Sequence, residues 1–201
     1  MRTPEDISRL HKTYGGYHPA LPSFRVRISA ILTEIPEQAF LNCHTLVDVL
    51  FLERERSSRL RRIGTAAFYG CTAFQRIVHG LPPGLRWIER GAFFNCAQLD
   101  GELVVTRIER RAFVECTSLC AMDLPETVVQ LADSAYRGCS SLVSVTIRAK
   151  SLNQIQFGNN FFQEFPSVSL LRMYPWFFPK LFQSMDDDPT FLFQFFRNYH
   201  E

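Results

Sequence analysis

Hydrophobic positions along the chain recur at a spacing much longer than the period of a helix or a strand. The shared pattern is Ile-x3-Ala-Phe-x2-Cys-x2-Leu-x2-Val, and five segments follow it with small changes. Their cysteines are Cys43, Cys71, Cys96, Cys116 and Cys139, so the intervals are 28, 25, 20 and 23 residues. A period of this length indicates a repeat protein in which each repeat forms one coil of a solenoid.

Each repeat contains two parts with different expected structures. Its end alternates apolar and polar residues, as at Met122 and Leu124, and this alternation predicts a short strand. Parallel strands of neighbouring coils would then stack about 4.8 Å apart. The Ala-Phe pair is expected on the returning side of the coil, in a short helical turn. Since one coil cannot bury these groups, we expect the aromatic residues of consecutive coils to share one dry column. Those residues are Phe40, Phe68, Phe93, Phe113 and Tyr136.

The Ala-Phe-x2-Cys-x2-Leu signature, with links such as Leu124-Pro125 and Leu81-Pro82, resembles the BspA-like leucine-rich repeats. The segment 24–40 is similar to the opening coil of the intracellular-looking protist members. The resemblance covers residues 24–148 and implies an α/β leucine-rich-repeat solenoid with its parallel strands stacked on one face. Two places depart from the pattern. Glu102 replaces an expected Val, and the link 51–62 is long and charged, so we expect local irregularity there.

The chain divides into three parts. Residues 1–23 form a polar N-terminal lead, residues 24–148 hold the repeats, and residues 149–201 are expected to form an aromatic cap of short helices. Solenoids must cover their open end, which accounts for much of this apolar load. The segment 191–196 is apolar on more than one side, so self-association through it remains an alternative.

Composition and charge narrow the classes of function. Hydrophobic residues make up 46% of the chain and charged residues 21%, and the net charge is +2. No strong overall field therefore draws the molecule toward nucleic acid or an acidic membrane. The N-terminal segment has no apolar run, and no stretch of about 18 apolar residues occurs, so we expect no signal peptide and no membrane insertion. These observations favour an intracellular protein, cytoplasmic or nuclear, over a secreted or surface protein.

The cysteines favour a structural role. Five of the six occupy one repeat position, and only Cys120 is extra. Equivalent positions in a stack form a column, where a free thiol acts as a small buried hydrophobe. No C-x2-C pair is present, so the spacing does not indicate a zinc site. Reduced thiols are typical of the cytosol or nucleus.

No catalytic pattern emerges. The histidines are scattered, and His44 beside Cys43 is interpreted as a surface residue rather than a catalytic partner. His79 takes a strand position that is normally apolar, and we interpret it as partly buried. Asp188 before Pro189 is better explained as a helix N-cap than as part of a metal site. We therefore predict no enzyme activity, no cofactor and no bound metal.

Two surfaces are candidates for binding. The first, the strand face, consists of the outward residues of the long strands, and the usual contact surface of a solenoid is of this kind. Its members are Asp48, Leu50, Arg76, Val78, Ala121, Asp123, Ser144 and Thr146. The second is a basic stripe beside the recurring Ile, with Glu89 and Glu109 interleaved. Its members are Arg61, Arg62, Arg86, Arg90, Arg107, Arg110 and Arg111. The stripe could be an exposed ion-pair ladder or a site for an acidic partner.

The hypothesis that fits these features best is a non-enzymatic protein–protein interaction scaffold that uses the strand face. A cell-surface adhesion module is the alternative, and nucleic-acid binding through the basic stripe is a lesser one. Under the first hypothesis, charge reversal at Arg76 and Asp123 is expected to leave folding intact while it abolishes partner capture.

Overall fold

In the computed structural model, the described residues are Asp6 and residues 22–52, 59–78, 80–82, 84–100, 107–148, 155–158 and 170–173, the last by backbone alone. The predictions for His79, Glu102, Asp188, Pro189 and the segment 191–196 lie outside these residues. So do most of the N-terminal lead and of the expected cap.

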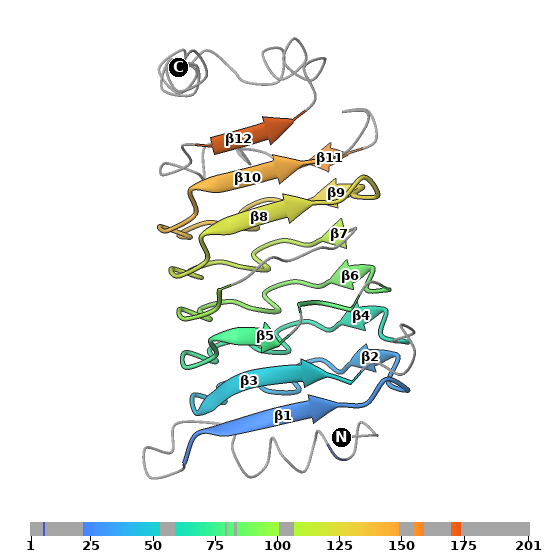
Figure 1. The fold of residues 1–201 in the computed structure, drawn as a ribbon, viewed down its shortest axis with the longest axis vertical. Coiled ribbons are helices and arrows are strands. Elements are labelled where there is room, and N and C mark those ends of the chain that lie inside the picture. Colours follow the sequence, from blue (N-terminus) through green and yellow to red (C-terminus); the bar gives the residue numbers. More distant parts are fainter. Residues whose placement is uncertain are drawn as a thin grey trace.

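The long strands of successive coils lie parallel to one another in one stack (Figure 1). β1 (Phe24–Ile28), β3 (Leu46–Phe51) and β5 (Arg76–Val78) form one three-stranded sheet. β8 (Ala121–Leu124), β10 (Ser144–Ile147) and β12 (Leu170–Met173) form another. Between them, in the described part of the third coil, Asp100 forms a parallel bridge to Arg76. The residues that follow Asp100, including Glu102, lie outside the described part of the chain.

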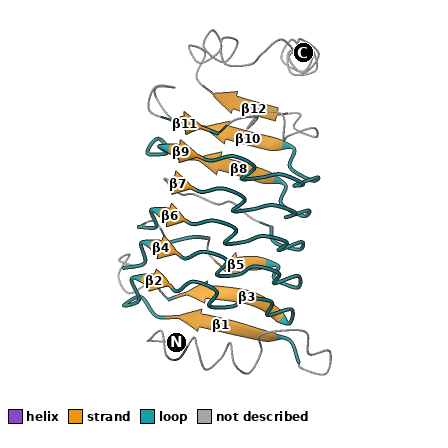
Figure 2. Cartoon of the chain, turned by 180° about the vertical axis from the view of Figure 1, so that it is seen from behind, coloured by secondary structure: helices purple, strands orange, loops and turns teal. Residues whose placement is uncertain are grey.

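A second stack is built from two-residue strands, and it runs through all the coils without a break (Figures 1 and 2). Its members in chain order are β2 (Glu34–Ile35), β4 (Arg62–Ile63), β6 (Trp87–Ile88), β7 (Arg107–Ile108), β9 (Gln130–Leu131) and β11 (Gln156–Phe157). All neighbouring pairs are parallel. We call these strands the short-strand sheet. The second residue of each strand belongs to or packs against the core, while the first points away from it.

The predicted dry column of aromatic residues is confirmed. Phe40, Phe68, Phe93, Phe113 and Tyr136 are each at most 1% exposed. Consecutive rings stack with centroids 5.0, 5.1, 5.2 and 5.1 Å apart and with nearly parallel planes. The Ala and Cys of each repeat lie in the same continuous core as these rings. Because no ring is enclosed by its own coil alone, stacking is what removes this apolar surface from water.

The returning side of the coil consists of consecutive turns, so the expectation of a short helical turn was wrong. Only Asp6 is helical among the described residues. In the first coil, alternate peptide N–H groups bond within the turn and to the next coil. The N–H of Ala39 donates to Pro36 within the turn, at 3.3 Å. The N–H of Phe40 donates instead to Ala67 of the next coil, at 2.7 Å. A helix would keep all these bonds to itself and could not join the coils.

Left-handed backbone conformations recur at two fixed places in each turn. One is the residue before the Ala and the other is the residue before the Cys. The first place holds Gln38, Ala66, Gly91, Arg111 and Ser134, and the second holds Asn42, Gly70, Asn95, Glu115 and Gly138. Their φ angles lie between 52° and 78°. Gly and Asn at the second place adopt this conformation readily, which gives the sequence a turn signal that the apolar pattern does not reveal.

The stack continues beyond residue 148, where the sequence analysis placed the end of the repeats. β11 pairs with β9, and β12 pairs with β10, so a further coil adds a strand to each stack. The sequence from Phe157 to Leu171 matches the repeat spacing, although Phe161 and Phe165 stand at the Ala and Cys positions. These two replacements hide the sixth copy from a search based on Ala and Cys.

Gly64 provides a test of how closely the coils approach. A Cβ at this position would lie 2.7 Å from the N atom of Glu37 and 2.9 Å from the O atom of Ile35, both backbone atoms of the preceding coil. We expect Gly64→Ala to lower the free energy of unfolding by about 1–3 kcal/mol, since the backbone must move apart. Denaturant titration followed by circular dichroism measures this change.

The matched control is Gly91→Asn. A Cβ there meets no atom closer than 3.9 Å, and the φ of +62° is one that Asn tolerates. We expect this variant to lose less than about 1 kcal/mol. Equal losses for the two variants would contradict close packing at Gly64.

Candidate interaction surfaces

The first half of the strand face is dominated by one buried carboxylate. Strand register places Asp48 between Arg25 and Arg76. Its carboxylate binds the Nε atoms of both arginines, at 2.9 and 3.3 Å, and its side chain is only 5% exposed. As predicted, Asp48 lies in the outward column of the strand face. The two arginines, however, cover its carboxylate. Asp48 therefore holds the two arginines in place and offers little surface of its own.

The other outward column of this half is mainly apolar. Leu50 pairs in register with Arg27 on one side and Val78 on the other. Leu50 and Val78 are half-buried and Arg27 is exposed. Leu50 and Val78 thus present a half-buried apolar strip to a partner, and the charged column of Arg25 and Arg76 borders this strip.

The second half of the strand face is more polar and lies on the other side of the third coil. Ala121 pairs with Ser144, and Asp123 pairs with Thr146. All four are half-buried. Arg148 binds Asp123, and its Nε lies 2.7 Å from Oδ1. The eight predicted residues thus form two separate blocks among the described strands.

The predicted basic stripe is not one surface, because its arginines occupy three different positions of the coil. Arg62 and Arg107 are outward residues of the short-strand sheet, while Arg61 and Arg86 precede that sheet. Arg90, Arg110 and Arg111 lie in the turns that follow it. Arg61 bonds to the carbonyls of Leu60 and Gly84, at 3.0 and 3.3 Å. The sequence spacing placed these residues near Ile correctly, but it could not resolve the separate columns.

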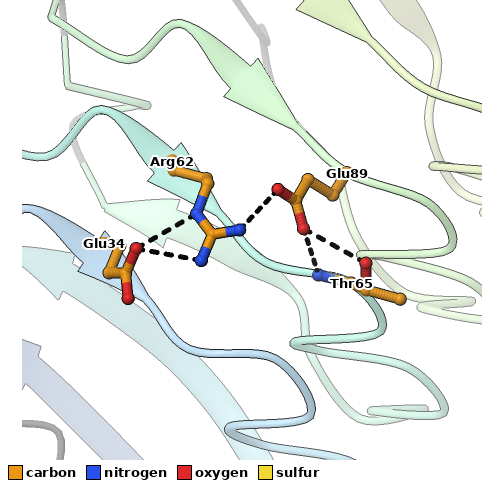
Figure 3. Close-up of polar contacts among 4 residues, drawn as sticks. All are labelled: Glu34, Arg62, Thr65 and Glu89. Atoms are coloured by element: carbon orange, nitrogen blue, oxygen red, sulfur yellow. Dashed lines mark hydrogen bonds and ion pairs between the residues drawn. The ribbon is translucent and has the colours of Figure 1, made fainter.

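Arg62 is enclosed by an internal ion-pair network (Figure 3). Its guanidinium binds Glu34 of the preceding coil at 2.9 Å and Glu89 of the following coil at 2.6 Å. Glu89 also accepts bonds from the N–H and the hydroxyl of Thr65, at 3.0 and 3.1 Å. The side-chain hydrogen bond to Glu89 is the main cause that raises the pKa of Arg62. At this position the ion-pair interpretation of the stripe holds.

The five column cysteines are buried, and none of the six forms a disulfide in the structure. From the second coil onward each thiol donates to the carbonyl of the Phe in the coil before it. Cys71 donates to Phe40 at 2.9 Å and Cys96 to Phe68 at 3.1 Å. Burial raises the pKa of Cys43 to about 12 and raises the pKa of Cys71 well above its ordinary value. Each of these protonated thiols therefore fills space in the core and donates a hydrogen bond to the preceding coil.

The remaining candidates for chemistry give no catalytic arrangement among the described residues. His44 Nδ1 lies 3.3 Å from the hydroxyl of Thr72, in the next coil. Cys120 is exposed, and its thiol donates to Asp100 at 3.1 Å. The part of the chain that the structure describes contains no group of three or more His, Cys, Asp or Glu residues that could hold a metal ion. No described helix is long and apolar enough to cross a membrane.

Parallel coils, tight returning turns and an Ala-Phe-Cys core define a leucine-rich-repeat solenoid. The family described as BspA type leucine rich repeat region matches residues 33–169 in six copies. This match spans more than half of the chain, and the chain belongs to that family. A comparison with curated protein sequences gave no match.

Three bacterial proteins of known structure are similar to this chain. A leucine-rich repeat protein from Bacteroides ovatus is 23% identical with a TM-score of 0.55, over 73% of this chain and 36% of that protein. The pneumococcal vaccine antigen PcpA is 17% identical with a TM-score of 0.54, over 79% of this chain and 44% of that one. The T. pallidum leucine rich repeat protein is 26% identical over 68% of this chain and 73% of that one, with a TM-score of 0.45. The chain thus spans about a third of the Bacteroides protein and less than half of PcpA.

Thiol labelling can separate the exposed Cys120 from the buried column. We expect Ellman's reagent at pH 8 to label one thiol of the native protein and the other five only after unfolding. The hydrogen bond to Asp100 is the main cause that raises the pKa of Cys120. A raised pKa leaves less thiolate at pH 8, so Cys120 should react more slowly than an unfolded cysteine. Asp100→Asn should speed the reaction, because it removes the carboxylate that raises this pKa.

The pairs on the strand face change the outcome expected for charge reversal at Arg76. Arg76→Glu would place a second carboxylate beside buried Asp48, and we expect it to lower the free energy of unfolding by about 1–3 kcal/mol. Arg137→Glu, at an exposed turn position, serves as the control and should change stability little. Thermal unfolding compares the two variants; equal midpoints would show that the Asp48 pairs contribute nothing.

Proposed function

We propose that the chain is a non-enzymatic protein-interaction module whose partner binds across the strand face. The observation that carries this proposal is the parallel register of the long strands. It fixes the outward side chains in straight columns while the inward ones build the core. Outward residues such as Leu50 and Thr146 can therefore contact a partner without any rearrangement of the fold.

The family supports a binding function in general terms. Leucine-rich repeats of this type generally mediate protein–protein interaction or adhesion. Both are contacts with another macromolecule rather than reactions, and both would use an exposed face of the stack. We favour a soluble protein partner over adhesion because the face combines an apolar strip at Leu50 and Val78 with fixed charges at its border.

We also propose that the chain works in a reducing compartment, cytoplasmic or nuclear. Support comes from Cys120, whose exposed thiol would be open to oxidation outside the cell. The buried column gives no information on this point, because it is shielded in either environment.

The decisive experiment uses strand-face variants that leave the ion pairs of Asp48 and Asp123 untouched. Leu50→Glu and Ser144→Arg change one outward residue in each block of the face, and Arg137→Glu changes an exposed turn residue as the matched control. The tagged full chain and its variants are incubated with extract from the native source, and captured proteins are quantified by mass spectrometry.

We expect the wild-type chain and the Arg137 variant to enrich the same proteins. Each face variant should reduce that enrichment at least tenfold at unchanged melting temperature, because a charge would enter a desolvated contact. Capture that survives both face variants would exclude the strand face as the binding surface. Treatment with nuclease before capture identifies any partner that is held only through nucleic acid.

A further inference from the structure

The outward column of the short-strand sheet changes character along the stack. Its residues in spatial order are Glu34, Arg62, Trp87, Arg107, Gln130 and Gln156. The first part is satisfied internally, because Arg62 lies between two glutamates (Figure 3). From Trp87 onward no such network exists among the described residues.

Arg107 occupies the same position as Arg62 two coils later, yet it has lost both acidic partners. Glu34 lies before Arg62 in the column, whereas Trp87 lies before Arg107. Glu89 follows the inward Ile of the coil after Arg62, whereas Ala132 follows the inward Leu131 of the coil after Arg107. Comparison with Arg62, at the equivalent position of the repeat, thus shows that the groups missing around Arg107 are the two carboxylates.

The guanidinium of Arg107 shows the effect of losing these acidic partners. The Nε atom of Arg107 is buried and has no hydrogen-bond partner. Arg107 also makes no ion pair with any residue in the described part of the chain. A buried N–H without an acceptor is unfavourable, and the Arg107 residue as a whole is only half-buried. A turn of its guanidinium toward an external carboxylate would supply the missing acceptor and pair the charge.

Trp87 lies beside Arg107 in the column and is 41% exposed. An indole in this position offers a flat apolar surface next to a cation that has no ion-pair partner among the described residues. On the other side lie Gln130 and Gln156, whose side chains form no hydrogen bond with another described residue. Their amides can bond to a peptide backbone. Cation, aromatic surface and amides therefore lie in one line across consecutive strands.

We propose that Trp87, Arg107, Gln130 and Gln156 bind an acidic segment of a partner protein. A carboxylate of the segment pairs with Arg107, and a neighbouring apolar side chain packs on Trp87. A nucleic-acid strand fits less well, because Glu34 in the column and Glu89 and Glu109 beside it would repel a continuous row of phosphates. This acidic-segment site is separate from the strand face and can be tested without it.

Tryptophan fluorescence gives a direct readout, because the chain has two tryptophans, Trp87 and Trp176. In a full-length Trp176→Phe protein the emission reports on Trp87 alone. The probe is the peptide acetyl-Glu-Leu-Asp-Phe-Glu-amide, and its matched control is acetyl-Gln-Leu-Asn-Phe-Gln-amide. We expect saturable binding of the acidic peptide that weakens as salt rises, and at least tenfold weaker binding of the amide peptide.

Variants then assign the contact. Arg107→Gln should reduce affinity for the acidic peptide at least tenfold and leave affinity for the amide peptide unchanged, whereas Arg137→Gln should change neither. The melting temperature of each variant checks that the fold is retained. Equal binding of the two peptides, no binding of either, or no effect of Arg107→Gln would overturn the proposal. Tighter binding of a twenty-residue oligo-dT that also depends on Arg107 would overturn it in favour of nucleic acid.

Discussion

Hydrogen bonds from each returning turn to the neighbouring coil set the spacing between consecutive coils. The N–H of Phe40 reaches the carbonyl of Ala67, while the thiol of Cys71 reaches back to the carbonyl of Phe40. Both bonds require the two backbones to lie close together, and this closeness brings the rings of Phe40 and Phe68 into contact at 5.0 Å. The left-handed residues of the turn make the geometry possible, because they aim alternate N–H groups out of their own coil. Burial of the aromatic column thus depends on backbone pairing, and each reinforces the other.

The core could be predicted from the sequence because its positions are defined by spacing and apolar character alone. Ala, Phe and Cys recur at fixed offsets, and all three are buried as expected. The conformation of the returning turn could not be predicted in this way, because an Ala-Phe pair suits a helix equally well. The residue that distinguishes the turn from a helix is the Asn or Gly before the Cys. The sixth coil was missed for a related reason. Phe161 and Phe165 keep the spacing but not the residue type, so the repeat stays apolar while its signature disappears.

The candidate surfaces could be predicted only in part, since outward direction follows from alternation but partners across coils follow from register. Asp48 was correctly placed outward, yet its burial depends on Arg25, and a register shift between Phe24 and Arg25 brings that arginine opposite it. Each arginine of the basic stripe lies close in sequence to the recurring Ile, but the arginines occupy different columns of the stack. Arg62 and Arg107 share a column, but their different surroundings arise from residues twenty or more positions away in the chain. Short-range sequence patterns do not contain that information.

The length of the returning turn is the same in every repeat, and this limits where the repeats can differ in length. The distance from the inward Ile or Leu to the Cys is eight residues in every repeat (35 to 43, 63 to 71, 88 to 96, 108 to 116, 131 to 139). All variation in repeat length therefore falls in the connection between the long and the short strands, which absorbs it at the side of the solenoid. Inserted or deleted residues there leave the rise per coil unaltered. Evolution, or a protein engineer, can accordingly display segments of different length along one flank while the spacing of the opposite columns stays the same.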